Sequence, residues 1–150
     1  MANFKNIFEK KKSVITFSLL CYIVACCFPS YLTENITRDN TVGGWFDLLT
    51  GWFAIFVMGK YAIFGLAWYA NITYIVSIHA FAQNHHKRFY FFNALTIILG
   101  LFFSQCPEII VDGYGEMGKF TLVEGYWLWL TSFFILLVGG ITEHTLSRKQ

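Results

Sequence analysis

Polar side chains inside apolar stretches are the residues of this sequence whose positions could support chemistry. Asn71 lies within a long apolar stretch, His79 follows it towards the end of that stretch, and Lys60 lies near the start. A polar side chain in hydrocarbon costs free energy, so it needs a partner or a polar path. Two interpretations follow. Asn71 joins neighbouring helices by hydrogen bonds, or Asn71, His79 and Lys60 form an intramembrane polar site that faces a pore or a partner.

A second candidate site lies between two runs that favour β-structure. Residues 108–111 and 120–123 are rich in β-branched and aromatic side chains, and three glycines interrupt the segment between them. Because glycine accepts positive φ angles, this pattern predicts a small β-hairpin at about residues 108–123. Asp112, Tyr114 and Glu116 would lie at its tip, where we expect an interaction surface.

The cysteines and histidines allow other chemistry. Cys106 and the pair Cys26 and Cys27 are expected near the same outer face, where an oxidising compartment would permit a disulfide between Cys106 and Cys26 or Cys27. The alternative is that they are small apolar side chains packed between helices. No Cys-x-x-Cys pair is present, and the histidines have no ligand spacing, so we expect no metal site. The histidines are His79, His85, His86 and His144.

Motifs for catalysis are missing from the sequence. It contains no Gly-x-Ser-x-Gly nucleophile motif, no P-loop and no dinucleotide-binding fingerprint. We therefore expect neither an enzyme nor a bound cofactor. A net charge of +2 without a basic stripe also argues against nucleic acid as a partner.

The composition indicates the elements that position these residues. The chain is 56% hydrophobic and only 13% charged, whereas soluble domains have about 25% charged residues. So few charges cannot form a surface that faces water, so lipid is the expected environment. A crossing needs about 20 residues, and the apolar stretches predict one all-α domain, residues 1–150, with transmembrane helices at about 12–30, 62–82, 89–106 and 125–143.

The stretch from residue 45 to residue 81 allows two interpretations. Residues 45–58 place aromatic and leucine side chains three and four positions apart, which is typical of a helix that lies in the membrane interface. A fifth crossing is the alternative. Charge favours four crossings, because basic residues then gather on one side with both termini, and such clusters mark the cytoplasmic side. Residues 30–44 are polar and predict a loop.

Three motifs support a resemblance. They are Gly44-Trp45 with Leu48, Leu49, Gly51 and Trp52; Ala67-Trp68-Tyr69-Ala70-Asn71; and Gly125-Tyr126-Trp127-Leu128-Trp129-Leu130. In this order, over about residues 43–140, the chain resembles a group of small uncharacterised bacterial four-helix inner-membrane proteins. The resemblance implies a bacterial inner (plasma) membrane and no known activity. Members often have proline after the Ala-Asn pair, where this chain has Ile72, so a kink at that point is left open.

These observations together predict a small integral membrane protein that acts through protein–protein interaction. A protective component, for toxin immunity or phage defence, fits a compact bundle with acidic outer loops and no catalytic motif. The alternative is a small homo-oligomeric channel or transport subunit. The expected partners are the lipid bilayer and either further copies of the chain or a second membrane-active protein.

Overall fold

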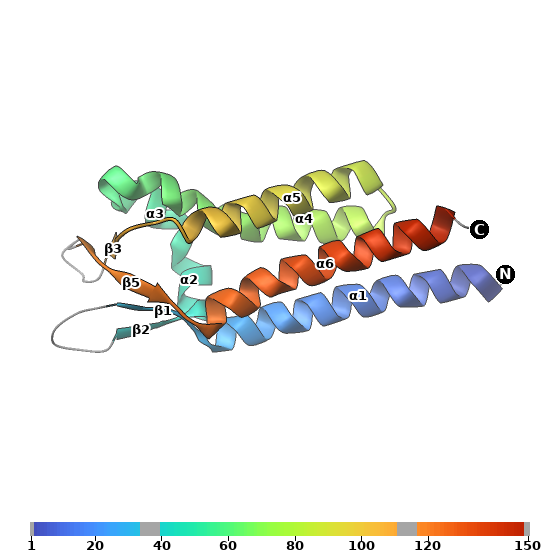
Figure 1. Ribbon diagram of the computed structural model, residues 1–150, viewed down its shortest axis with the longest axis horizontal. Helices are drawn as coiled ribbons and strands as arrows, with labels where there is room; N and C mark the ends of the chain where they lie inside the picture. Colours follow the sequence, from blue (N-terminus) through green and yellow to red (C-terminus); the bar gives the residue numbers. More distant parts are fainter. Residues whose placement is uncertain (1, 34–39, 111–116, 149–150) are drawn as a thin grey trace.

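Four long helical segments form most of the protein. The computed structural model describes residues 2–33, 40–110 and 117–148. The helical segments lie roughly along the long axis (Figure 1). Both termini and the turn between α4 and α5 lie at one end, here called the terminal end, and the strands lie at the opposite end, the sheet end. The helical segments are α1 (Ala2–Cys27), η2 (Gly59–Tyr69) continued by α4 (Ala70–Ala82), α5 (His86–Phe103) and α6 (Glu124–Arg148).

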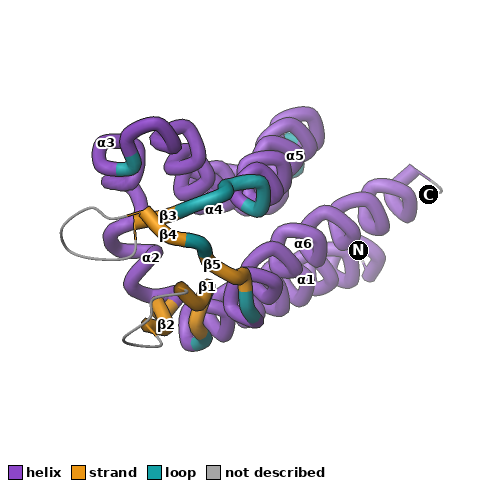
Figure 2. The backbone as a smooth tube through the Cα atoms, turned by 60° about the vertical axis from the view of Figure 1, so that its left-hand side comes forward, coloured by secondary structure: helices purple, strands orange, loops and turns teal. Residues whose placement is uncertain are grey.

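The helices pack in two pairs, α1 along α6 and α4 along α5, as the two views of the backbone show (Figures 1 and 2). Their shared core is apolar and contains large aromatic side chains. Tyr74, Phe133 and Leu136 at its centre are at most 1% exposed. The space between the pairs is therefore filled by side chains along this part of the bundle.

Local chemistry explains where the helices end. Pro29 follows α1 and disfavours helical backbone in the residue before it. At the end of α4, Asn84 adopts a positive φ of 63°, a conformation that asparagine tolerates, and reverses the chain into α5.

Lys11 connects three elements at the terminal end. It donates a hydrogen bond to Asn84 Oδ1, and its Nζ lies 3.3 Å from Glu143 Oε1. These contacts join α1, the α4–α5 turn and α6 at the terminal end.

Two small sheets cover the sheet end. The first has the order β2 (Asn40–Gly43), β1 (Pro29–Thr33) and β5 (Phe120–Leu122), with both pairings antiparallel. The prediction that residues 30–44 form a loop is therefore wrong. The physical reason is long-range pairing: Tyr31 lies opposite Leu122 in the register, and no local pattern shows a partner so far along the chain.

The hairpin predicted for residues 108–123 is present only in part. Strands β3 (Ile109–Ile110) and β4 (Met117–Gly118) pair antiparallel, as predicted. Strand β5 pairs with β1 instead of with the 108–111 run, which corrects the prediction. The predicted interaction residues Asp112, Tyr114 and Glu116 lie outside the described residues.

The segment predicted as one interfacial helix is broken. It consists of α2 (Gly44–Thr50), the short η1 (Gly51–Phe53) and α3 (Ala54–Val57). Gly59 then reverses the chain with φ of +52°, and η2 returns against α3 so closely that a Cβ at Gly65 would lie 2.6 Å from the backbone nitrogen of Ile55. Glycine at these two positions allows the reversal and the close contact.

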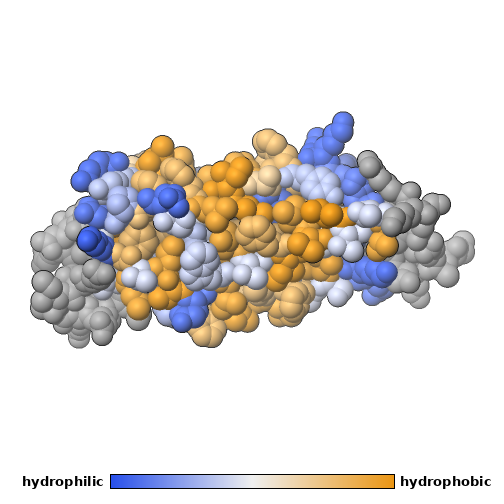
Figure 3. All heavy atoms as spheres, in the orientation of Figure 1, coloured by the Kyte–Doolittle hydropathy of each residue, from blue (hydrophilic) through white to orange (hydrophobic). Residues whose placement is uncertain are grey.

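Two helices are long and apolar enough to cross a membrane, by length and composition. They are Gly59–Ala82 and Glu124–Leu146, in the described part of the chain, and they overlap the second and fourth predicted crossings. Apolar residues cover the middle of the face in Figure 3, while hydrophilic residues gather towards both ends. Large exposed apolar side chains include Phe17, Ile75, Phe91, Ile98 and Val138, each at least 60% exposed.

The interior, by contrast, holds polar side chains that bond across helices. Ser18 of α1 donates to the carbonyl of Ser132 in α6 at 2.7 Å, and Thr96 of α5 donates to Thr73 of α4 at 2.7 Å. Ser18, Thr96 and Ser132 are completely buried. A core that is mostly apolar thus also contains hydrogen-bonded polar side chains, and the large exposed apolar surface around it is unusual for a soluble protein.

The contact between α1 and α6 tests this packing. A Cβ added at Gly139 would lie 2.2 Å from Val14 Cγ1, and valine cannot turn away because its χ1 is restricted. We expect Gly139→Ala to lower the free energy of unfolding by about 1–3 kcal/mol, as overpacking does. Thermal unfolding in mild detergent measures this. Val14→Ala added to Gly139→Ala should recover most of the loss, and a loss of the same size in the double variant would contradict the close contact.

Candidate functional site

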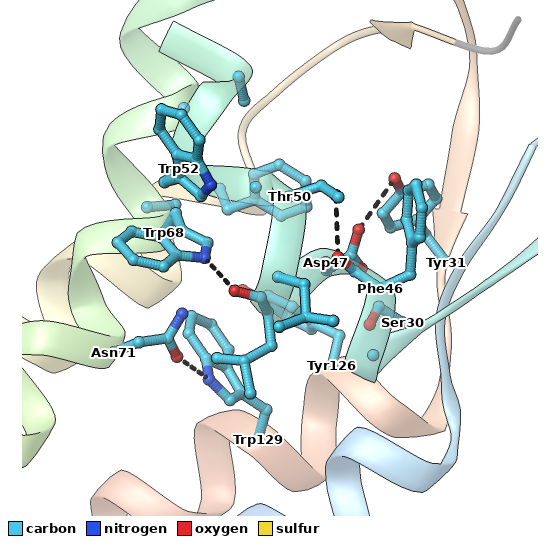
Figure 4. A pocket seen from close by; sticks show the side chains of 18 of the residues that line it. Ser30, Tyr31, Phe46, Asp47, Thr50, Trp52, Trp68, Asn71, Tyr126 and Trp129 are labelled. Carbon is cyan, nitrogen blue, oxygen red and sulfur yellow. Dashed lines mark hydrogen bonds between the residues drawn. The ribbon is translucent and has the colours of Figure 1, made fainter.

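A cavity of about 870 Å³ lies at the sheet end and is here called the sheet-end cavity. It is formed where α2, η1 and α3 stand between η2 and the ends of α1 and α6, and Figure 4 shows its side chains. Cavities that bind small molecules have about 300–1,000 Å³ and are mostly apolar, with a few polar groups. The size of this cavity falls within that range, so it is the candidate functional site.

Asn71 forms one polar wall of the cavity. Its Oδ1 accepts hydrogen bonds from Trp129 Nε1 and from the Tyr22 hydroxyl, both at 2.9 Å. Because an indole nitrogen can only donate, the atom facing Trp129 must be the amide oxygen. The amide nitrogen of Asn71 therefore points to the cavity side, towards Trp68 (Figure 4). The side chain joins α1, α4 and α6 and presents one donor to a bound molecule.

Asp47 forms the second polar wall. It belongs to the first turn of α2 and is partly buried against β1, where the Tyr31 hydroxyl donates to its Oδ1 at 3.3 Å. Burial raises the pKa of Asp47 to about 6, while hydrogen bonds from Ser30 and Tyr31 act in the opposite direction. A carboxyl group with a raised pKa inside a cavity is a common property of functional sites.

Aromatic side chains supply most of the remaining wall. Trp68 Nε1 donates to the carbonyl of Leu48 at 2.9 Å, which fixes η2 against α2. The fit is close, because a Cβ at Gly51 would lie 2.6 Å from Trp68 Cδ1. Trp52 and Tyr126 face the same space (Figure 4). The contacts of Trp68 therefore position α2, which carries Asp47, and the start of η1.

The three residues predicted as an intramembrane polar site are not brought together. Asn71 lines the sheet-end cavity, but Lys60 and His79 do not. Lys60 is exposed at the start of η2, with its Nζ 4.7 Å from the centre of the Tyr61 ring, and His79 is exposed on α4. The structure thus gives Asn71 the hydrogen-bonding role between helices and places the other two on the surface.

Of the two interpretations of the cysteines, the structure does not contain the possible disulfide between Cys106 and Cys26 or Cys27. All four cysteines are free thiols. Cys106 is buried in a cluster with Met58 and Ile109, and its Sγ donates to the carbonyl of Glu108 at 3.1 Å. Cys26 lies in α1 and lines the cavity, whereas Cys106 does not. The two sulfur atoms therefore lie in different surroundings.

The histidines come together only as a pair at the terminal end. The rings of His86 and His144 stack with their centres 4.7 Å apart, and Nδ1 of His144 lies 3.4 Å from the Tyr90 hydroxyl. In the described part of the chain, no group of three histidine, cysteine or acidic side chains is close enough to hold a metal ion. We therefore assign no metal site to these residues.

Sequence reasoning missed Asp47 as a site residue. Asp47 is a single acidic residue among the apolar residues of the 45–58 segment, and that pattern alone assigns it no role in a site. Its hydrogen-bond partners Ser30 and Tyr31 belong to a strand that was predicted as a loop. The available signal was an acidic residue within a segment rich in tryptophan. This signal does not show that β1 lies beside Asp47 and supplies its hydrogen-bond partners.

Fold and site together define a small helical protein with many exposed apolar side chains, an apolar core that also holds hydrogen-bonded polar side chains, and an aromatic cavity at the sheet end. No protein-family model, curated protein or solved structure matches the chain. The resemblance to small bacterial inner-membrane proteins therefore stays a prediction, and the function must be argued from the site.

The raised pKa of Asp47 predicts a stability that depends on pH. A carboxyl group whose pKa is higher in the folded protein stabilises it below the unfolded value of 3.8, and this stabilisation is lost as the pH rises through about 6. Asp47→Asn cannot ionise. We therefore expect the variant to be more stable than the wild type at pH 8, by at most about 3 kcal/mol, and equally stable near pH 4. Thermal unfolding across this pH range measures the difference, and an identical difference at both pH values would contradict a raised pKa.

Proposed function

We propose that the protein is a small integral membrane protein that crosses the bilayer four times and binds a small apolar or amphiphilic molecule in its sheet-end cavity. The observation that carries this proposal is the cavity itself. It has the volume and the aromatic lining of a small-molecule site, and Asn71 and Asp47 place polar groups on two of its walls.

The distribution of polar groups supports four crossings. Helices α1 and α5 pack along the two helices that are apolar enough to span a membrane. Large apolar side chains project from them, such as Phe17 on α1 and Ile98 on α5. Lipid is the environment in which such a surface is stable and in which serine, threonine and asparagine bond across helices instead.

The charges support an orientation. Lys10, Lys12, Lys87 and Arg88 lie at the terminal end, together with both chain termini. Clustered lysine and arginine mark the cytoplasmic side of an inner membrane. In this proposal the terminal end is cytoplasmic, the sheet end faces outwards in a bacterial inner membrane, and the cavity lies near the outer surface.

Binding explains the site better than catalysis. Among the described lining residues, Asp47 is the only acid, and no histidine or lysine accompanies it. General acid–base and nucleophilic catalysis usually combine two such groups within hydrogen-bonding distance. One carboxyl group surrounded by aromatic rings is instead an arrangement for selecting a ligand.

A protective interaction protein is the second candidate function. Exposed aromatic side chains surround the cavity region, including Trp45, Trp52, Phe53 and Trp127. Such a surface would accept an apolar segment of a second membrane-active protein, as toxin immunity or phage defence requires. A pore through a single bundle has less support, since Tyr74, Phe133 and Leu136 fill its centre.

A substitution that fills the cavity tests the binding proposal. Leu48 lines the cavity, so Leu48→Trp adds an indole to the space that a ligand would occupy. We expect it to weaken binding of the neutral fluorescent probe N-phenyl-1-naphthylamine about tenfold, which corresponds to about 1.4 kcal/mol. The measurement is probe fluorescence with protein in lipid nanodiscs, after subtraction of empty nanodiscs.

The matched control adds the same side chain elsewhere. Ile75 is 66% exposed on α4 and does not line the cavity. Ile75→Trp should leave probe affinity unchanged. Absence of saturable binding to the wild type, or equal losses in the two variants, would overturn the proposed binding site.

A further inference from the structure

We propose that the sheet-end cavity selects an apolar molecule that carries a single positive charge, which binds between the Asp47 carboxylate and the aromatic rings. This inference rests on the proposed function and names the chemical class of the ligand. It is carried by the charges of the cavity, the faces of its aromatic rings and the surroundings of Asp47.

The lining residues give the cavity one sign of charge. No lysine, arginine or histidine lies among its described lining residues, and Asp47 is the acidic one. Among the described residues, the basic side chains of the sheet end are Lys60 and Lys119, and both are exposed and do not line the cavity. An ionised Asp47 thus makes the cavity negative and favours a cation over an anion.

The aromatic rings add to this preference. The faces of tryptophan, tyrosine and phenylalanine carry partial negative charge and attract cations within about 6 Å of the ring centre. Phe46, Trp52 and Trp68 line the same cavity as Asp47, and the Tyr31 hydroxyl contacts its carboxylate directly. Rings together with one carboxylate are a general means of binding a bulky organic cation that has few hydrogen-bond donors.

Asp47 has no basic partner within the part of the chain that the structure describes. Its partners are the Tyr31 and Ser30 hydroxyl groups, and no lysine or arginine of the described chain forms an ion pair with it. A carboxylate has about four acceptor sites, so these two hydroxyl groups leave some for a ligand. A partly buried carboxylate without a counter-ion is unfavourable, and a bound cation removes this cost.

Asn71 would orient the molecule. Its amide nitrogen, a possible donor to a bound molecule, lies on the wall opposite Asp47 (Figure 4). A cationic group would avoid this donor and lie beside Asp47, and the apolar part of the molecule would extend between Trp68 and Tyr126. A negatively charged molecule of the same shape would meet the Asp47 carboxylate instead.

Two probes of the same shape and opposite charge test the inference. Tetraphenylphosphonium is a cation and tetraphenylborate is an anion with the same four rings. We expect isothermal titration of the protein in nanodiscs, with empty nanodiscs subtracted, to show saturable binding of the phosphonium at least about tenfold tighter than of the borate. Equal affinity for both, or saturable binding of neither, would overturn cation selection.

The variants locate the effect at Asp47. Asp47→Asn keeps the shape of the side chain and should weaken phosphonium binding at least about tenfold. Glu124→Gln removes an exposed negative charge at the same end without changing the lining, and it should bind as the wild type does. If Asp47→Asn binds the phosphonium unchanged, the charge of Asp47 does not select the ligand.

The pH profile gives an independent readout. Around Asp47 the titratable lining groups are Tyr31 from β1, Tyr22 and Cys26 from α1, and Tyr126 from α6, and their ordinary pKa values are about 8.5 or higher. Phosphonium affinity should therefore fall as the pH drops below about 6 in the wild type, and Asp47→Asn should show no such dependence. A flat profile for the wild type would contradict the inference.

Failure of this inference and failure of the proposed function can be told apart. If N-phenyl-1-naphthylamine binds and Leu48→Trp weakens it, the cavity is a binding site whatever the two charged probes show. Loss of charge selection alone then rejects only the cationic ligand. Absence of binding by the neutral probe and by both charged probes rejects both proposals.

Discussion

Polar side chains inside this helical bundle must find hydrogen-bond partners there, and the rest of the structure depends on this constraint. Their partners are backbone carbonyls and other side chains of the bundle. Ser18 and Thr96 are completely buried and donate across helices, Ser18 to the backbone carbonyl of Ser132 and Thr96 to the Thr73 hydroxyl. Asn71 has the same role where α1, α4 and α6 meet, since it accepts from Tyr22 and Trp129 together. In lipid these bonds have little competition from water, so they fix which helices are neighbours.

The sheet-end cavity follows from the same constraint. Near the sheet end, α2, η1 and α3 stand between η2, which continues into α4, and the ends of α1 and α6, and the strands lie at the same end. Gly51, Gly59 and Gly65 permit the reversal and the close packing that this requires. The result is a space lined by rings in which burial raises the pKa of Asp47, and carboxyl groups with a raised pKa are common at functional sites.

The sequence predicts the helices well and the sheet end poorly. Apolar length alone identifies helices over residues 62–82 and 125–143, because that signal is local. The pairing of Tyr31 with Leu122 cannot be read from the sequence, since each run is short and the partners are far apart in the chain. For the same reason Asn71 is recognised as an internal polar residue, whereas Asp47 is not recognised as part of a cavity.

The most direct test of the central claim, an outer cavity on a bundle that spans the membrane, is labelling of single cysteines in intact bacterial cells. With the four natural cysteines replaced, Thr121→Cys places an exposed thiol at the sheet end and Gln83→Cys places one at the terminal end. A maleimide that cannot cross membranes should label Thr121→Cys in intact cells and Gln83→Cys only after the cells are opened. The reverse pattern, or labelling of both residues only after the cells are opened, would contradict the account.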